Sequence, residues 1–229
     1  MILIKKNNFF SIKFVTILFS LFIFSSLTKA KDRYFYQLGY GYVEGYTHSK
    51  FYPNDQTNFF GGNIQGYRAD FGLGLNSEIN KIKVDYILSY SPDAFNNQVD
   101  TKNSCPNAQF ECRVNIKDSI DLGVKIYLPA NYNNITPAIY LGLSNADIQL
   151  KSLNRTGANG TAMMSHQRNW GAAAGASLNY PLKEYNVDIS LDYSWTAYER
   201  NIEQVDTFGN ITGSRPEIHS TSLKVKKYF

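Results

Sequence analysis

The sequence has little of what several common protein classes require. Beyond residue 30 it has no apolar run long enough for a transmembrane helix, and the apolar spacing of amphipathic helices is hard to find. It also has no excess of one charge there: residues 1–30 carry four lysines and no acidic residue, which leaves 23 − 4 = 19 basic against 19 acidic residues. A clustered basic surface for nucleic acid is therefore excluded.

Residues 1–30 are predicted to form a signal peptide. Residues 1–13 are basic, residues 14–24 form an apolar core, and residues 28–30 read Thr-Lys-Ala, which supplies small residues for cleavage. A retained membrane anchor is the alternative, but the apolar core is shorter than the ~20 residues that span a bilayer as a helix. We therefore expect one exported domain, residues 31–229.

Cysteine is scarce, with Cys105 and Cys112 as the whole complement. Because export takes both thiols to an oxidising compartment, we expect a disulfide that closes a short polar surface loop. A loop of this size contributes roughly 2–3 kcal/mol to stability in the chain-entropy model. A redox centre or a zinc site is disfavoured, since no pair of histidines lies near the two cysteines.

What the sequence does contain is a repeated, strand-like alternation. Residues 66–76 place five apolar side chains on one face and charged residues or glycine on the other. This period of two is typical of a strand whose faces meet different environments. Comparable segments predict eight strands, at residues 34–42, 66–76, 81–90, 119–128, 138–144, 170–182, 187–197 and 220–229.

The connections between these strands alternate between long and short. Long polar loops are expected at 45–61, 93–115, 151–167 and 203–217, and short turns at 77–80, 130–135 and 183–186. This spacing predicts an all-β, transmembrane, up-and-down antiparallel β-barrel of eight strands, with four long outer loops and three short periplasmic turns. A soluble periplasmic barrel is the alternative, but its polar face would be the outer one. Aromatic girdle residues such as Trp170 and Tyr180 favour the membrane barrel.

The polar face of the predicted strands carries as many basic as acidic residues. They are Arg68, Lys83, Lys125, Lys224, Lys226, Asp70, Asp85, Asp121, Asp188 and Asp192. An eight-stranded barrel is just wide enough for side chains to fill, and buried charges need partners. We therefore expect a mutually neutralising interior charge network, with a proton or ion path as the functional alternative.

The segment 220–229 keeps its alternation up to Phe229. With the eight predicted strands, it resembles the small eight-stranded outer-membrane β-barrel family of the OmpX and opacity type, whose last strand finishes on Phe and is recognised during membrane insertion. The resemblance implies that Leu223, Val225 and Phe229 form a C-terminal insertion signal for the barrel-insertion machinery. It also implies the cell outer membrane of a Gram-negative-type bacterium. Lys227 departs from the aromatic residue usual in the family.

No catalytic, cofactor-binding or metal-binding constellation is expected. The histidines His48, His166 and His219 are predicted to lie at the outer end, and the pairs Ser165-His166 and His219-Ser220 place a serine beside a histidine. Adjacency in sequence does not supply the geometry that activates a serine. We therefore expect no enzymatic activity and no cofactor.

The long predicted loops favour recognition, because loops on a rigid scaffold are where binding usually resides. We expect a non-enzymatic surface protein whose loops contact a host component, another cell or envelope lipid. A narrow porin-like channel for small solutes or ions is the second hypothesis, and a structural envelope protein is the third. The expected partners are outer-membrane lipid, the insertion machinery and ligands of the loops.

Overall fold

The computed structural model describes the backbone of residues 32–52, 62–92, 97–99, 110–154, 163–199, 201–205 and 211–229. Within these ranges the chain is almost entirely β-strand, and no helix there is long and apolar enough to cross a membrane. The elements are β1 (Arg33–Tyr52), β2 (Gly62–Ile79), β3 (Ile82–Ser91), β4 (Asn97–Val99), β5 (Phe110–Tyr127), β6 (Thr136–Asn154), β7 (Met163–Leu182), the short 3₁₀ helix η2 (Lys183–Tyr185), β8 (Val187–Tyr198), β9 (Asn201–Val205) and β10 (Ile211–Tyr228).

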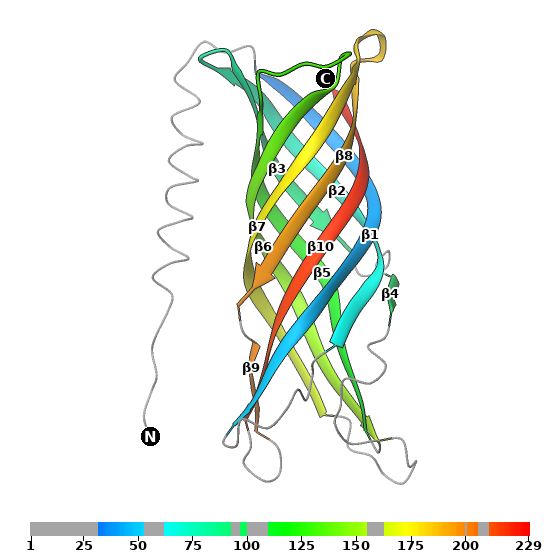
Figure 1. Cartoon of the computed structure of the whole chain (residues 1–229), viewed down its shortest axis with the longest axis vertical. Coiled ribbons are helices and arrows are strands. Elements are labelled where there is room, and N and C mark those ends of the chain that lie inside the picture. The colour runs from blue at the N-terminus through cyan, green and yellow to red at the C-terminus, as the bar shows by residue number, and fades with distance from the viewer. Residues whose placement is uncertain are drawn as a thin grey trace.

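Eight of these strands form a closed antiparallel barrel in up-and-down order (Figure 1). Each long strand pairs with its neighbour in the chain, and β1 pairs with both β2 and β10. In the closing pair, Leu38 of β1 lies opposite Val225 of β10. The predicted all-β barrel is therefore confirmed. Closure pairs the backbone groups that an open sheet would leave exposed along its edges.

Tight turns join the strands at one end of the barrel, the upper end in Figure 1. Asn80 and Lys81 connect β2 to β3 with φ values of 50° and 69°, and Asn133 and Asn134 turn between β5 and β6 with φ values of 50° and 68°. Positive φ at both central residues matches the twist of a hairpin. The third connection is η2, followed by Asn186 in the left-handed region. We call this the turn end.

At the opposite end the strands extend well beyond the predicted limits. β1 continues to Tyr52 and β6 to Asn154, while β10 already begins at Ile211. The long loops predicted at 45–61, 93–115, 151–167 and 203–217 are therefore longer than the structure allows, because much of each range is strand. The short strands β4 and β9 pair with β2 and β10 in this extension. The stretches in between lie outside the described residues. We call this the loop end.

The outer wall of the barrel is apolar over its central part. Exposed side chains include Leu73 of β2, Leu141 of β6 and Leu223 of β10, together with Trp170 and Tyr180 of β7. Val84 and Tyr86 also lie on the outward face of their strand, β3, but in contrast to these residues they are buried. Residues of the opposite parity point inward. The interior contains buried Asp85, Lys125 and Lys226.

Candidate functional site: the barrel interior

The buried carboxylate of Asp85 is the centre of a cluster near the turn end. Its Oδ2 accepts from the Lys226 ammonium at 2.6 Å and from the Tyr127 hydroxyl at 2.7 Å, and its Oδ1 accepts from the Asn76 amide at 2.5 Å. The side chains of Asp85 and Lys226 are only 1% and 7% exposed. Burial at this level requires both a charge partner and hydrogen bonds, and here each is present.

Asp188 of β8 extends this cluster across the lumen. Its Oδ2 lies 3.6 Å from the Lys226 ammonium and 3.5 Å from the Lys83 ammonium, and it accepts from the Tyr228 hydroxyl at 2.7 Å. The Lys83 ammonium also lies over the Tyr127 ring, 4.6 Å from its centroid. Cations are attracted to aromatic faces at this distance. Charges and aromatic rings thus line the turn end of the lumen.

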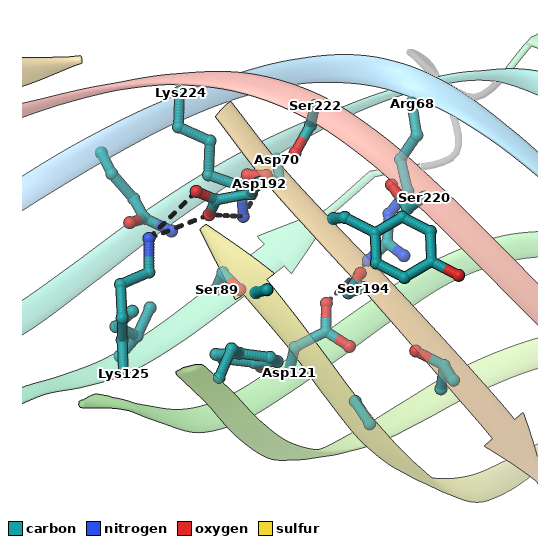
Figure 2. Close-up of a pocket in the computed structure, with 17 residues that line it drawn as sticks. Arg68, Asp70, Ser89, Asp121, Lys125, Asp192, Ser194, Ser220, Ser222 and Lys224 are labelled. Atoms are coloured by element: carbon teal, nitrogen blue, oxygen red, sulfur yellow. Dashed lines mark hydrogen bonds and ion pairs between the residues drawn. The ribbon is translucent and has the colours of Figure 1, made fainter. Parts of the chain in front are cut away.

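A second cluster fills the middle of the barrel, where Lys125 and Lys224 converge on Asp192 (Figure 2). The two ammonium groups lie 3.0 Å and 3.7 Å from Asp192 Oδ2, and Lys224 also lies 3.2 Å from Asp70. The carboxylates come from β2 and β8 and the lysines from β5 and β10. The cluster therefore ties together strands that are far apart in the sequence.

Arg68 forms the third group of the interior, next to the middle cluster. Its guanidinium donates to Asp121 at 2.7 Å, to the Ser91 hydroxyl at 2.6 Å and to the Ser119 hydroxyl. The Ser91 hydroxyl in turn donates to the backbone carbonyl of Ala69 at 2.5 Å. A guanidinium fork with several fixed acceptors holds its charge in one geometry.

These charged groups surround a small cavity of about 70 Å³. Its lining also includes Tyr140 and hydroxyl-bearing residues such as Ser89, Ser194 and Ser222 (Figure 2). Since one water needs roughly 10–15 Å³ of such volume, the cavity has room for a handful of waters. The Oδ1 atom of Asp70 is buried without a hydrogen-bond partner among the described residues. A water in this polar cavity would satisfy it.

The Tyr140 side chain narrows the lumen at the level of this cavity. A β-carbon added at Gly123 or at Gly142 would overlap its ring or hydroxyl. Glycine at these positions of β5 and β6 therefore makes room for an inward-pointing tyrosine. Tyr140 and the ion pairs together occupy most of the lumen at this level, so that a small separate cavity remains and not a wide channel.

Toward the loop end the interior changes from charged to apolar. Inward-facing side chains of six strands meet in one buried cluster, which we call the apolar plug. It consists of Val43, Ile64, Ile116, Ala146, Ile148, Tyr198 and Ile218. The Tyr198 hydroxyl, at its edge, hydrogen-bonds to the Ser144 hydroxyl at 2.9 Å. The plug separates the charged interior from the loop end.

The structure places all ten predicted interior charges in ion pairs inside the barrel. Arg68 pairs with Asp121, Lys83 and Lys226 share Asp188, Lys226 also pairs with Asp85, and Lys125 and Lys224 share Asp192, with Lys224 also on Asp70. Sequence reasoning did not find the plug. Its signal was an inverted alternation, with an isoleucine between polar neighbours in Asn63-Ile64-Gln65, Asp147-Ile148-Gln149 and Glu217-Ile218-His219.

The remaining predicted positions lie elsewhere. Leu223, Val225 and Phe229 point outward and are exposed. Cys105 and the side chain of Cys112 lie outside the described residues, as does the predicted signal peptide, residues 1–30, so the disulfide and the cleavage remain predictions.

The three histidines do not come together in a described site. His219 is on the outer wall, where its Nδ1 hydrogen-bonds to the Tyr193 hydroxyl at 2.7 Å. The side chains of His48 and His166 are outside the described set. Among the described residues, no group of three or more His, Cys, Asp or Glu is arranged to hold a metal ion.

Comparison with known proteins finds likeness in structure alone. No protein-family model and no curated protein sequence matches the chain. Neisserial surface protein A has 15% sequence identity and a TM-score of 0.45, over 86% of this chain and 97% of that one. A major outer membrane protein from Thermus thermophilus has 12% identity and a TM-score of 0.48, over 87% of this chain and 100% of that one.

A third similar structure is Ail, the attachment invasion locus protein of Yersinia pestis, solved in complex with the heparin analogue sucrose octasulfate. It has 12% identity and a TM-score of 0.29, over 82% of this chain and 98% of that one. The barrel of the present chain is defined by its own strand pairing, independently of these neighbours.

Proposed function

We propose that this chain is a non-enzymatic outer-membrane β-barrel with a closed lumen, which acts through recognition at its loop end. The observation that carries the proposal is the filling of the lumen by ion pairs, Tyr140 and the apolar plug. Because the lumen is closed, a ligand can reach only the outer wall and the two ends of the barrel.

The distribution of side chains supports the placement in a membrane. Leucines and aromatic residues are exposed on the outer wall, while buried aspartates and lysines lie within. A barrel in water would need the reverse arrangement, whereas a lipid-facing barrel needs an apolar band outside and tolerates a polar interior. Closure also satisfies the backbone groups that lipid cannot.

The closed interior supports a scaffold in preference to a channel. The charged cavity measures about 70 Å³, and the plug residues Ile64, Ile148 and Ile218 are 3%, 0% and 4% exposed. An apolar constriction excludes water and therefore ions. Solute passage would require at least these side chains to move apart.

The asymmetry between the two ends supports recognition at the loop end. Short turns connect the strands at one end, whereas strands such as β1 and β6, of 20 and 19 residues, extend the other. These extensions carry the segments around 53–61, 100–109, 155–162 and 206–210. The proposed ligand class is a host, cell or envelope surface component.

Two segments of the chain, residues 1–30 and the end of β10, are proposed to act in export and membrane insertion. Residues 1–30 are removed as a signal peptide, and the insertion machinery of a Gram-negative-type outer membrane recognises Leu223, Val225 and Phe229. The outward exposure of these three side chains on and next to the closing strand β10 supports such a role.

Planar-bilayer conductance of the refolded chain tests the closed lumen. We expect a barrel that changes gel mobility on boiling yet passes no steady current. The double variant Ile64→Gly/Ile148→Gly, which removes two plug side chains, should produce openings, while Leu73→Gly/Leu141→Gly on the outer wall should stay silent. Steady channels in the unmodified protein, altered by Asp121→Asn, would instead establish the porin-like alternative.

Binding of whole cells tests the recognition part. Shortening the segments 53–61 and 155–162 should abolish adhesion to host cells or matrix, with surface display and heat-shifted mobility retained. Arg168→Gln, on the outer wall, serves as a control with intact loops. Unchanged adhesion and unchanged serum survival after loop shortening would favour the structural envelope role.

A further inference from the structure

A second cavity, of about 170 Å³, opens at the turn end. It lies among the ends of β3, β5, β6, β7 and β8, on the far side of the ion-pair clusters from the plug. Its polar lining includes Lys81, Lys83, Asn179 and Asp188, with Thr136 and Tyr127, and Ile82 and Leu128 are among its apolar residues. This cavity has more than twice the volume of the charged cavity in the middle of the barrel.

Two lysines in this lining have donors to offer a ligand. Lys81 is exposed at the hairpin turn. The Lys83 side chain is 41% exposed, and its ammonium lies 3.5 Å from Asp188, which is long for a charged pair. An ammonium has three N–H donors, and beside this one long ion pair the Lys83 ammonium contacts only the faces of the Tyr127 and Tyr228 rings among the described residues, at 4.6 Å and 5.4 Å from their centroids, which leaves donors for an anion. The pair of lysines therefore suits a phosphate.

The buried amide of Asn179 contributes a hydrogen-bond acceptor that has no donor in the described part of the chain, in contrast to the lysines, which offer donors. Its Nδ2 donates to the Thr136 carbonyl at 3.1 Å and to the Ser177 hydroxyl at 2.9 Å, which fixes the orientation of the amide. Its Oδ1 is buried with no hydrogen-bond partner among the described residues, and the residue is 2% exposed. Unpaired buried acceptors are costly. Because Asn179 lines the cavity, a small shift of its side chain would let a ligand that brings a donor as well as an anion satisfy this oxygen.

The rim of the cavity points to a lipid as the source of that ligand. Ile82 lies two positions before Val84 on β3, and Leu128 lies two positions after Ile126, the partner of Val84, just past the end of β5. Both are exposed on the apolar outer wall, at 47% and 37%. The same two residues line the cavity. A molecule at this rim meets lysines on its polar side and aliphatic side chains on its membrane side.

We propose that this turn-end cavity binds the phosphoethanolamine headgroup of a phospholipid in the adjacent leaflet. The phosphate pairs with Lys81 and Lys83, the ligand ammonium donates to Asn179 Oδ1, and an acyl chain descends along Ile82 and Leu128. This inference rests on the membrane placement proposed above. It assigns the turn end a ligand, whereas the proposed recognition lies at the loop end.

Native mass spectrometry of the detergent-refolded chain tests the site with defined lipids. Phosphatidylethanolamine is compared with phosphatidylcholine, whose quaternary ammonium has no N–H donor. One hydrogen bond of about 1 kcal/mol corresponds to roughly fivefold, so phosphatidylethanolamine should bind at least about fivefold tighter. Asn179→Ala should remove this preference. Inorganic phosphate and glycerophosphoethanolamine are added as competitors to separate lipid from free phosphate.

Lys81→Asn is the principal variant, because Asn tolerates the positive φ of 69° found at this turn position. Removing one lysine near a phosphate should weaken retention about fivefold. Lys183→Gln, an exposed lysine of η2 at the same end that is not among the lining residues, should leave binding unchanged. This control distinguishes a formed site from general attraction to basic charge.

Three outcomes would overturn the site. They are equal retention of the two lipids, equal effects of the Lys81 and Lys183 variants, and full competition by millimolar inorganic phosphate, which would assign the cavity to a soluble ion. Gel mobility on boiling is measured first for every sample. A chain without the shift would refute the barrel proposal and this site together, whereas a shifted chain without lipid preference would refute this site alone.

Discussion

The Lys226–Asp85 pair provides the most direct test of how the interior charges stabilise the barrel. The perturbation is Lys226→Met, which keeps the length of the side chain but removes its charge. Asp85 then remains in a site where its side chain is 1% exposed. Its remaining hydrogen bonds come from Tyr127 and Asn76, neither of which carries a positive charge.

The expected loss of stability follows from this environment. Removing one partner of a buried ion pair costs about 3–5 kcal/mol, because it leaves an uncompensated charge. The two remaining hydrogen bonds solvate part of that charge, so we expect a value of about 3 kcal/mol, at the lower end of that range. Lys226 also lies 3.6 Å from Asp188, but that carboxylate keeps its contacts with Lys83 and Tyr228.

A double variant separates charge from packing. In Lys226→Met/Asp85→Asn the uncompensated charge is gone, and the single amide oxygen still accepts from the Tyr127 hydroxyl, while the new NH2 group faces Asn76, whose amide must turn its oxygen toward it. We expect most of the loss to be recovered, with a coupling energy above about 2 kcal/mol, which is within the range for residues in contact. The control is Arg168→Met at the exposed Arg168–Asp118 pair, with side chains 47% and 22% exposed, where less than about 1 kcal/mol is expected.

Urea unfolding in lipid vesicles, followed by tryptophan fluorescence and by gel mobility, measures all of these variants. A loss below about 1 kcal/mol for Lys226→Met, or a double variant whose loss equals the sum of the two single ones, would refute the reasoning. Either result would mean that water reaches Asp85 freely, and the closed lumen would then also be in doubt.

Two further predictions use the same unfolding assay. Gly123→Val should lower the free energy of unfolding by about 1–3 kcal/mol, as overpacking does, because the valine side chain would meet the Tyr140 ring. Gly123→Val/Tyr140→Ala should relieve this clash, and a double variant less stable than Gly123→Val would contradict the explanation. Cys105→Ser should cost roughly 2–3 kcal/mol if the predicted disulfide with Cys112 forms, and alkylation of both thiols in the unreduced chain would contradict it.

The alternation in the sequence was enough to predict the barrel, its strand order and the residues that point inward. Residues 66–76 show why: each apolar side chain faces outward and each charge or glycine faces the lumen, so the period of two survives in the structure. The turns predicted at 130–135 and 183–186 lie where the chain reverses, whereas the turn predicted at 77–80 is displaced, because β2 continues to Ile79 and Asn80 and Lys81 make the turn.

The loop-end half of the barrel was not accessible to the same rule. Beyond Val43 and Ile64 the faces exchange character, with Glu44 and Gln65 outward and the apolar plug inward. A polar outer face is also what a loop presents, so the predicted strands stop short of these residues, which belong to none of the predicted strands or loops. The pairing of particular charges, such as Lys226 with Asp85, depends on closure between strands far apart in the chain and leaves no local signal.

The ion pairs also bear on how such a chain enters a membrane. Lys226 and Asp85 are 141 positions apart in the sequence, and Lys224 on β10 meets Asp70 on β2. Before the ring closes, a sheet laid in lipid would expose these charges at about 2.5–3.5 kcal/mol each near the bilayer centre. For the six charges in or next to the middle cluster alone this comes to roughly 15–20 kcal/mol, so stepwise insertion of single hairpins is strongly opposed. Crossing the bilayer and closing the ring must then occur as one event, or within a sheltered site that shields the polar face until β10 meets β1.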